Sequence, residues 1–365
     1  MHSMRVVAIG VGGAGGRIVD ALYQDDANRP ASYLAGGCVL DTDGVDLAAL
    51  TAVPEDARQL FGQAETNGNG TGGDREVAAA ALEEDLVEMQ RVVDSAVTSD
   101  AAAIILVTGL GGGTGSVATP KLADELQAVY NRPVYSVSVL PAAHEDIPAE
   151  NPARALQSLD SVVDAQIVFD NDVWLNAEHD VLEVADELNQ TLAEHLGAIF
   201  SAGEAASADS VGQRVVDASE IIATLNEGGL ATIGYAQQTL DSQADSASLL
   251  GRVRGLVGAR DETVDEVAAI KAVETTLRRA TRGRLTLNYP LNAATSGLLV
   301  VSGPPAWLHQ SAISDGQTWL SEEIGSVQLR TGDNPIPNGD SLAILVLFAG
   351  IRDAPRIDEL RTTNS

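Results

Sequence analysis

The 365-residue sequence is poor in the residues that build disulfides and metal clusters. Cys38 is its only cysteine, so neither an intramolecular disulfide nor a thiolate cluster for structural zinc can form. No pair of histidines has a metal-ligand spacing such as H-E-x-x-H; they are His2, His144, His179, His195 and His309. No apolar stretch approaches the roughly 20 residues that cross a bilayer, and the first residues show no cleavable signal pattern. We therefore expect a cytoplasmic protein that is not a histidine-based metalloenzyme.

Positive charge is also scarce. The chain carries 52 acidic residues against 22 basic ones, of which only Lys121 and Lys271 are lysines, and its net charge is −30. This balance argues against nonspecific DNA binding. At molar salt the Debye length falls to about 3 Å, which screens repulsion between acidic side chains. The composition therefore predicts a protein from a halophile.

Short apolar runs alternate with helical patterns through the first two hundred residues. This order predicts an α/β fold with a doubly wound, mostly parallel sheet. The expected strands are residues 5–10, 37–41, 102–108, 134–140 and 166–169, and the expected helices are near 16–25, 74–99, 119–130, 151–164 and 182–200. Residues 63–73 are rich in glycine and asparagine and predict a mobile loop.

The pattern changes after residue 210 and predicts a second, smaller α/β domain. Its expected helices are near 219–226 and 261–280, and its expected strands are 231–236, 285–287, 297–302, 327–330 and 341–349. The predicted divisions are a Rossmann-like domain at 1–181, a central connecting helix at 182–208, a C-terminal domain at 209–352 and a short polar tail at 353–365.

Two glycine-dense loops each follow an apolar run. Residues 10–16 read Gly-Val-Gly-Gly-Ala-Gly-Gly, and residues 109–116 read Gly-Leu-Gly-Gly-Gly-Thr-Gly-Ser. Backbone N–H groups without Cβ crowding close around phosphate oxygens, and a helix behind each loop adds the positive end of its dipole. The second loop has no lysine and is no Walker motif, so backbone amides, with the Thr114 and Ser116 hydroxyls, must bind the anion. The two loops predict one nucleotide site.

The first loop alone also fits a different class of protein. Gly10, Gly12 and Gly15 match G-x-G-x-x-G, and Asp41 or Asp43 lies downstream to meet a ribose. This pattern leaves open an NAD-dependent Rossmann oxidoreductase, although it does not explain the second loop. A tight strand-to-helix turn without any ligand is the other reading of a lone glycine loop.

The second loop closely resembles the signature loop of the tubulin and FtsZ superfamily. The order of the other motifs is similar too: the first loop, Asp-Thr-Asp at 41–43, a glycine-rich segment at 68–74, Asn171-Asp172 and Asn189. The resemblance spans essentially the whole chain. The acidic composition and the Phe-Asp-Asn-Asp-Val-Trp segment at 169–174 are most similar to the haloarchaeal CetZ group. The resemblance to the superfamily implies a Rossmann-like nucleotide domain, a long central helix and a second α/β domain.

The resemblance implies GTP and GDP as ligands, with Mg²⁺. Asn171 and Asn189 match the family's guanine contacts, Glu145 matches its ribose contact, and Arg154 matches a partner arginine only after an insertion. The resemblance places Asp74 facing the γ-phosphate and Mg²⁺, whereas its residue type and position favour an N-cap for the next helix, and the two roles are compatible. The implied nucleotide contacts are Gly10, Val11, Gly12, Gly13, Ala14, Gly15, Arg17, Asp41, Asp43, Gly72, Gly73, Gly109, Gly111, Gly112, Gly113, Thr114, Gly115, Glu145, Asn171 and Asn189.

Asp217 and Glu220 are three residues apart, which on a first helical turn points both carboxylates to one side. Alone they are acids that favour a helix N-terminus. The resemblance makes them the catalytic pair of the family's synergy loop, with Val215 in place of the usual asparagine. Such a pair serves the nucleotide of the next subunit, which implies an assembly-stimulated GTPase and an open, head-to-tail filament.

Two further points concern the activity of the protein and its role in the cell. A nucleotide-binding scaffold that neither assembles nor hydrolyses remains open, because Val215 departs from the family pattern. The polar residues 353–361 lack an apolar anchor-binding peptide, which favours control of cell shape or motility over leadership of a division ring. Partners on the envelope and the geometry of lateral contacts cannot be predicted from the sequence.

Overall fold

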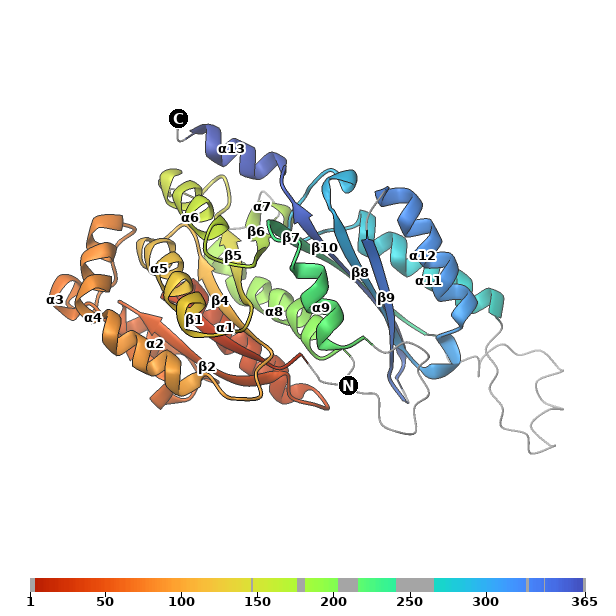
Figure 1. Cartoon of the computed structure of the whole chain (residues 1–365), viewed down its shortest axis with the longest axis horizontal. Coiled ribbons are helices and arrows are strands. Elements are labelled where there is room, and N and C mark those ends of the chain that lie inside the picture. The colour runs from red at the N-terminus through yellow and green to blue at the C-terminus, as the bar shows by residue number, and fades with distance from the viewer. Residues whose placement is uncertain are drawn as a thin grey trace.

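The computed structural model describes residues 4–145, 147–175, 181–202, 216–240, 266–325, 328–337 and 339–363. Within them, ten strands form one sheet in the order β3-β2-β1-β4-β5-β6-β7-β10-β8-β9 (Figure 1). The strands are β1 (Val6–Val11), β2 (Leu34–Asp41), β3 (Arg58–Leu60), β4 (Ala103–Gly109), β5 (Val134–Leu140), β6 (Ala165–Asp170), β7 (Leu230–Thr239), β8 (Ser296–Gly303), β9 (Gln328–Pro335) and β10 (Ser341–Ile351). The helices are α1 (Gly12–Asn28), α2 (Gly44–Ala49), α3 (Gln63–Thr66), α4 (Arg75–Ala96), α5 (Gly113–Val129), α6 (Glu150–Asp160), α7 (Asn171–Trp174), α8 (Val181–Phe200), α9 (Ala218–Leu225), α11 (Glu266–Arg282), α12 (Gln310–Ile324) and α13 (Pro355–Thr363).

The sheet is mostly parallel, as the sequence predicts. Strands β1 to β6 all pair in parallel, and β7 joins β6 through Gln166 and Leu230. Among the strands of the described residues, only β10 runs antiparallel to its neighbours, β7 and β8, while β9 is parallel to β8. The predicted second α/β unit therefore continues the first sheet and does not form a sheet of its own.

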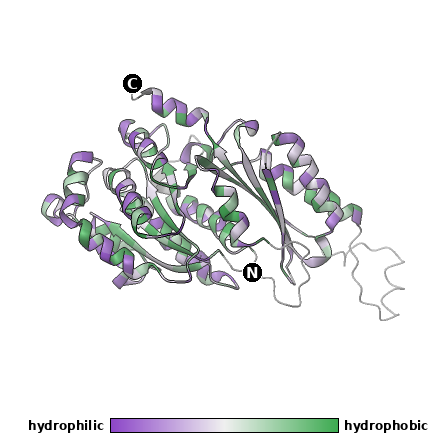
Figure 2. Ribbon diagram, in the orientation of Figure 1, coloured by the Kyte–Doolittle hydropathy of each residue, from purple (hydrophilic) through white to green (hydrophobic). Residues whose placement is uncertain are grey.

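Helices cover both faces of the parallel half, which explains why its strands are continuous apolar runs. Helices α1 and α8 contact each other on one face, and α4 and α5 contact each other on the opposite one. Figure 2 shows the hydrophobic strands between helices whose outer surfaces are hydrophilic. Because every β1 residue is buried, the polar chemistry must come from the loops at the strand ends.

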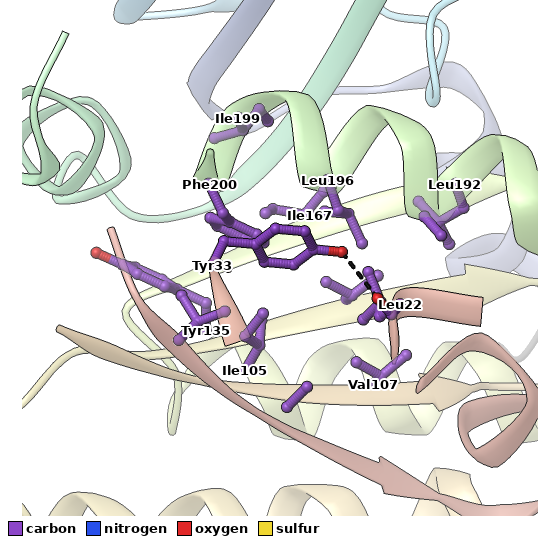
Figure 3. Close-up of a cluster of buried hydrophobic side chains, with 14 of the residues drawn as sticks. Leu22, Tyr33, Ile105, Val107, Tyr135, Ile167, Leu192, Leu196, Ile199 and Phe200 are labelled. Atoms are coloured by element: carbon purple, nitrogen blue, oxygen red, sulfur yellow. Dashed lines mark hydrogen bonds between the residues drawn. The ribbon is translucent and has the colours of Figure 1, made fainter. Parts of the chain in front are cut away.

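The long helix α8 packs along the core between the two halves of the sheet. Leu192, Leu196 and Phe200 face Leu22 of α1 and the strands beneath (Figure 3). The Tyr33 hydroxyl donates to the Leu22 carbonyl at 3.1 Å. At 20 residues, α8 is on the order of 30 Å long, enough to run along the strands from their carboxyl ends to their amino ends.

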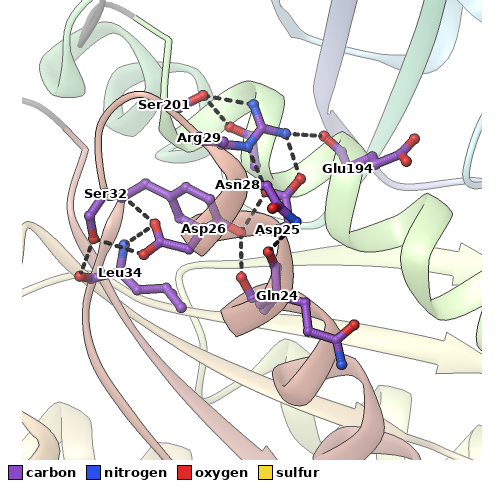
Figure 4. A network of polar contacts seen from close by, with 12 residues as sticks. Gln24, Asp25, Asp26, Asn28, Arg29, Ser32, Leu34, Glu194 and Ser201 are labelled. Carbon is purple, nitrogen blue, oxygen red and sulfur yellow. Dashed lines mark hydrogen bonds and ion pairs between the residues drawn. The ribbon is translucent and has the colours of Figure 1, made fainter. Parts of the chain in front are cut away.

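A polar network fixes the C-terminal end of α8 to the C-terminal end of α1 (Figure 4). The Arg29 guanidinium binds both oxygens of Asp25, at 2.5 and 3.0 Å. It also donates to the Ser201 hydroxyl at 3.0 Å and to the Glu194 carbonyl at 3.2 Å. Since Tyr33 and Arg29 lie just before β2, this network marks the amino-terminal edge of the sheet.

Several predicted boundaries are wrong. Helices α1 and α5 begin at Gly12 and Gly113, earlier than predicted, because glycine's poor helix propensity hides a helical first turn. The predicted loop at 63–73 opens with α3, and Gly70 N–H donates to the Thr42 carbonyl. Residues 285–287 form no strand; Leu285 makes a single bridge to Gly234.

Five described helices are absent from the prediction: the short α2, α3 and α7, and the longer α12 and α13. Helix α12 lies in the C-terminal half, where no helix was expected between the last strands. Helix α13 occupies most of the predicted polar tail, and its Ile357 and Leu360 are buried in the same core as Leu156 of α6. The tail reads as polar because only these two positions of a short helix face the core.

His195 of α8 is buried beside Trp174 and Tyr235, with ring centroids 5.4 and 5.2 Å away. Burial lowers its pKa from 6.5 to about 4. The folded state therefore resists protonation, and stability is lost as the pH falls from 6.5 towards 4.

We expect His195→Leu to remove this loss, worth up to roughly 3 kcal/mol. Urea unfolding between pH 7 and 4 measures it, with His309→Leu as control; parallel curves for wild type and His195→Leu would contradict it.

Candidate nucleotide site

One cavity, of about 430 Å³, lies where the carboxyl ends of the parallel strands meet. Loops after β1, β2, β4, β5 and β6 all contribute to it, together with α8. Most residues that the sequence predicts as nucleotide contacts line this cavity: Val11, Gly12, Gly13, Ala14, Arg17, Asp41, Asp43, Gly72, Gly73, Gly109, Gly111, Gly112, Gly113, Thr114, Gly115, Glu145 and Asn171. Ligands bind open α/β sheets at this edge.

Both glycine loops open directly into helices, so each offers the free N–H groups of a first turn. Neither α1 nor α5 has an acidic residue in that turn, although the chain has 52 acids. The loops also touch: a Cβ on Gly12 would lie 3.3 Å from the Gly115 nitrogen. The arrangement suits an anion held by two helix dipoles.

Gly10 and Gly15 do not line the cavity. A Cβ on Gly10 would lie 2.7 Å from the Gly15 carbonyl oxygen, and one on Gly15 would collide with the Val107 carbonyl. These two glycines allow α1 to approach β1 and β4 closely. Their fingerprint spacing is thus explained by packing.

Gly112 is the opposite case, since it lines the cavity and is exposed. Its φ of −77° is open to any residue, and an added Cβ would meet no protein atom within 4 Å. No packing or backbone requirement of the described residues therefore demands glycine here. A ligand close to the main chain would.

Hydroxyl and amide groups join the loops to one another. The Thr114 hydroxyl is 2.8 Å from that of Thr42 and 3.3 Å from that of Thr71. Buried Asn151 of α6 donates to the Gly73 carbonyl at 3.0 Å and to the Gly111 carbonyl at 2.9 Å. Thr71 and Asn151 were not predicted as site residues, because their partners are distant in sequence.

Ser116 does not face the cavity, contrary to expectation. Its buried hydroxyl donates to the Gly113 carbonyl at 3.1 Å and accepts from Arg75 at 3.0 Å. Ser116 therefore braces the second loop from behind, and Thr114 is the hydroxyl available to a ligand.

Acidic side chains gather at one rim of the cavity. Burial raises the pKa of Asp41 to about 7, against the lowering effect of the N–H of Thr42. Asp43 caps α2 by accepting from the Val45 and Asp46 N–H groups at 2.7 and 3.3 Å. Asp46, which sequence analysis missed, pairs with Arg17 at 3.2 Å. Among the described lining residues Arg17 is the one basic side chain, so an anionic ligand depends on backbone dipoles or a cation.

The opposite end of the cavity holds the expected base and ribose contacts only in part. Asn171 opens α7 there, and Glu145 accepts from the Ala142 N–H at 2.5 Å. Asn189 does not line the cavity; Ala185, one turn earlier on the same face of α8, does. Arg154 pairs with Glu150 at 3.2 Å on α6 and is not part of the lining.

Asp74 also lies off the lining. It caps α4, accepting from the Glu76 and Val77 N–H groups at 2.8 and 3.2 Å. In the described part of the chain no three His, Cys, Asp or Glu side chains cluster as metal ligands. These residues thus fit only a cation carried by phosphate and water.

Asp217 and Glu220 belong to a different part of the molecule. Asp217 caps α9, and the Ser219 hydroxyl holds the pKa of its carboxyl below the usual value. Helix α9 packs against β8 and β10, and it contributes nothing to the cavity lining. The two acids therefore cannot belong to the cavity of their own subunit. Val215 lies outside the described residues.

Comparison with known proteins identifies the fold family. The Tubulin/FtsZ family, GTPase domain, matches residues 5–179, and the family described as Tubulin-like CetZ, C-terminal domain, matches residues 178–365. The chain belongs to the tubulin/FtsZ family. CetZ5 of Haloferax volcanii is 39% identical over 361 residues, covering 99% of this chain and 91% of the relative. The resemblance to the CetZ group is thereby confirmed.

Solved structures agree. CetZ1 of Haloferax volcanii, a GDP-bound monomer, superposes with a TM-score of 0.85 at 35% identity and 98% coverage of both chains. CetZ2 of the same organism, a GTPγS-bound protofilament, gives a TM-score of 0.83 at 33% identity, covering 99% of this chain and 97% of the other.

Within the described residues, no helix is long and apolar enough to span a bilayer.

Proposed function

We propose that this chain binds GTP in the cavity, assembles head to tail into filaments and hydrolyses GTP at the junctions. The observation that carries the proposal is the convergence of two acid-free helix N-termini on one cavity in a chain of this family. Relatives have been solved with GDP as a monomer and with GTPγS as a protofilament.

The phosphates would lie against the backbone of the two loops, with Thr114 donating a hydroxyl. The base would lie towards Asn171 and the ribose towards Glu145, with Asn189 reached only by a ligand that extends along α8. Mg²⁺ would be held mainly by phosphate oxygens and water, with Asp74 at most through a water. It would neutralise phosphate charge beside the acidic rim.

Hydrolysis would take place between subunits. Asp217 and Glu220, remote from their own cavity, would lie over the γ-phosphate of the next molecule and orient the attacking water. Assistance of this kind is worth about 10²–10⁴ in rate. Such a heterologous contact repeats by translation and yields an open filament.

Fluorescence titration with labelled GTP and with NADH tests the binding step. GTP binding without NADH binding supports the proposal, whereas the reverse would favour the oxidoreductase.

Light scattering after GTP addition in molar KCl, measured together with phosphate release, separates a polymerising GTPase from an inert scaffold. We further propose a cytoplasmic role in cell shape. We also propose the predicted limits of the nucleotide-binding domain, the central helix and the C-terminal domain, except that α13 extends the C-terminal domain beyond residue 352. Imaging of a tagged copy, along the envelope or at midcell, tests that role.

Assembly should depend strongly on salt. With a net charge of −30 on each subunit, longitudinal contact brings large like charges together at low ionic strength. We expect GTP-dependent light scattering to appear in molar KCl and to disappear in dilute buffer. Circular dichroism in both buffers checks that the fold persists. Equal polymer yield in dilute buffer would contradict the screening argument.

A further inference from the structure

Arg356, near the start of the C-terminal helix α13, reaches both segments at the base end of the cavity. Its Nη2 donates to the Pro141 carbonyl at 3.1 Å and lies 3.2 Å from an Asp172 carboxylate oxygen. Pro141 lines the cavity, and Asp172 directly follows Asn171, which lines it too. One guanidinium thus joins the loop after β5 to the first turn of α7.

Three acids meet Arg356: Glu359 lies on the same helix, 3.0 Å from Nη1, and the other two are tied to the cavity segments. The second oxygen of Asp172 accepts from the Ala143 N–H at 2.8 Å, across the same gap. Asp170, 3.8 Å from the Arg356 Nε, accepts from the Asp172 N–H at 3.2 Å at the start of α7. Burial raises the pKa of Asp170 to about 6, and Arg356 opposes that rise. Without the guanidinium, two close carboxylates would repel each other beside Asn171.

The position of Arg356 is fixed from behind. Its side chain is 13% exposed, and the adjacent Ile357 and Ala354 are fully buried in a core shared with α6. Figure 1 shows α13 lying across the end of the sheet near α6. Exposed ion pairs are screened at molar salt, whereas this partly buried pair, whose Asp172 side chain is 32% exposed, is screened less. The bridge therefore persists where the chain's acidic surface is fully screened.

We propose that Arg356 is a positioning residue that sets base recognition at the nucleotide site. This inference rests on the proposed GTP binding. Arg356 holds the 141–145 loop and the first turn of α7 in register, so that Asn171 and Glu145 meet the nucleoside. The phosphate cradle is built by other loops and does not depend on Arg356. The C-terminal helix thus acts on which base is bound and leaves phosphate affinity unchanged.

The test measures affinity for labelled GTP, with unlabelled ATP and inorganic triphosphate as competitors, in the full-length protein. Arg356→Gln should weaken GTP binding about tenfold, the worth of one displaced hydrogen bond, and should leave competition by triphosphate unchanged. The preference for GTP over ATP then shrinks. Arg356→Lys keeps the charge without the planar fork and should lie between. Arg361→Gln, on the same helix and exposed, is the matched control and should match wild type.

An unchanged GTP-to-ATP preference in Arg356→Gln would overturn the inference, as would an equal loss of GTP and triphosphate binding. Thermal unfolding monitors the fold. Should Arg356→Gln not fold, Asp172→Asn breaks the same bridge from its other end and must lower the preference in the same way. A wild-type protein that binds no GTP overturns the proposed function itself, whereas GTP binding with an unaltered variant overturns only the role of Arg356.

Discussion

Glu220→Ala is expected to bind GTP like wild type, to assemble, and to release phosphate about 10²–10⁴ times more slowly. The reason is the separation of α9 from the cavity, which leaves Glu220 no part in its own subunit's nucleotide contacts. Filaments should outlive those of wild type, because GTP would persist at the junctions. Phosphate release and light scattering, recorded together in molar KCl, measure both effects.

Glu227→Ala is the matched control, since Glu227 is an exposed acid just after α9 and should leave turnover unchanged. Mixing provides a sharper test of a site shared by two subunits. Glu220→Ala can still bind GTP, and Gly112→Val, which blocks the phosphate-binding loops, still carries Glu220. A mixture of the two variants should therefore hydrolyse GTP faster than either variant alone. Wild-type turnover in Glu220→Ala would remove this residue from catalysis.

Gly112→Val should weaken GTP binding about a hundredfold and leave the fold intact, with Gly112→Ala intermediate. The side chain would enter the cavity where an added Cβ meets no protein atom within 4 Å. It would push phosphate oxygens away from the α5 N–H groups, and losing about two charge-assisted hydrogen bonds has this cost. Titration with labelled GTP gives the affinity, and thermal unfolding without nucleotide gives the stability.

Gly44→Ala is the control for this series. Gly44 also opens a helix, does not line the cavity, and has room for a Cβ, whose nearest atom is 3.7 Å away. It should bind GTP like wild type. Unaltered GTP affinity in Gly112→Val would show that the phosphates lie elsewhere, and a large drop in melting temperature would show that the cradle is structural.

The phosphate loops could be predicted because their signal is local. A run of glycines between a strand and a helix by itself predicts an anion-binding turn, and most of the residues predicted as nucleotide contacts line the cavity. Thr71, Asn151 and Arg356 carried no such signal. Each acts through a partner 40 or more positions away, and only the folded chain brings the pair together. Asn189 was placed by resemblance alone, and it stays a proposal.

The same contrast explains the errors in the fold. Strands β1 and β4 were found because burial of nearly every residue makes them apolar runs, and β5 was found although Ser136 and Ser138 interrupt its valines. Helix α13 was missed because a nine-residue helix with two core positions has almost no periodicity to read. The starts of α1 and α5 were placed late because glycine argues against a helix everywhere except in its first turn.

A phosphate cradle made of main chain has a consequence for how this surface evolves. Amide dipoles are encoded by no particular side chain, so surface lysines outside the first turns of α1 and α5 can be replaced by acids while the cradle is kept. A chain with only two lysines can therefore keep an anion site without any lysine in it. Substitutions that delete side chains would pass over the main-chain part of such a site, whereas substitutions that add atoms, such as Gly112→Ala, would reveal it.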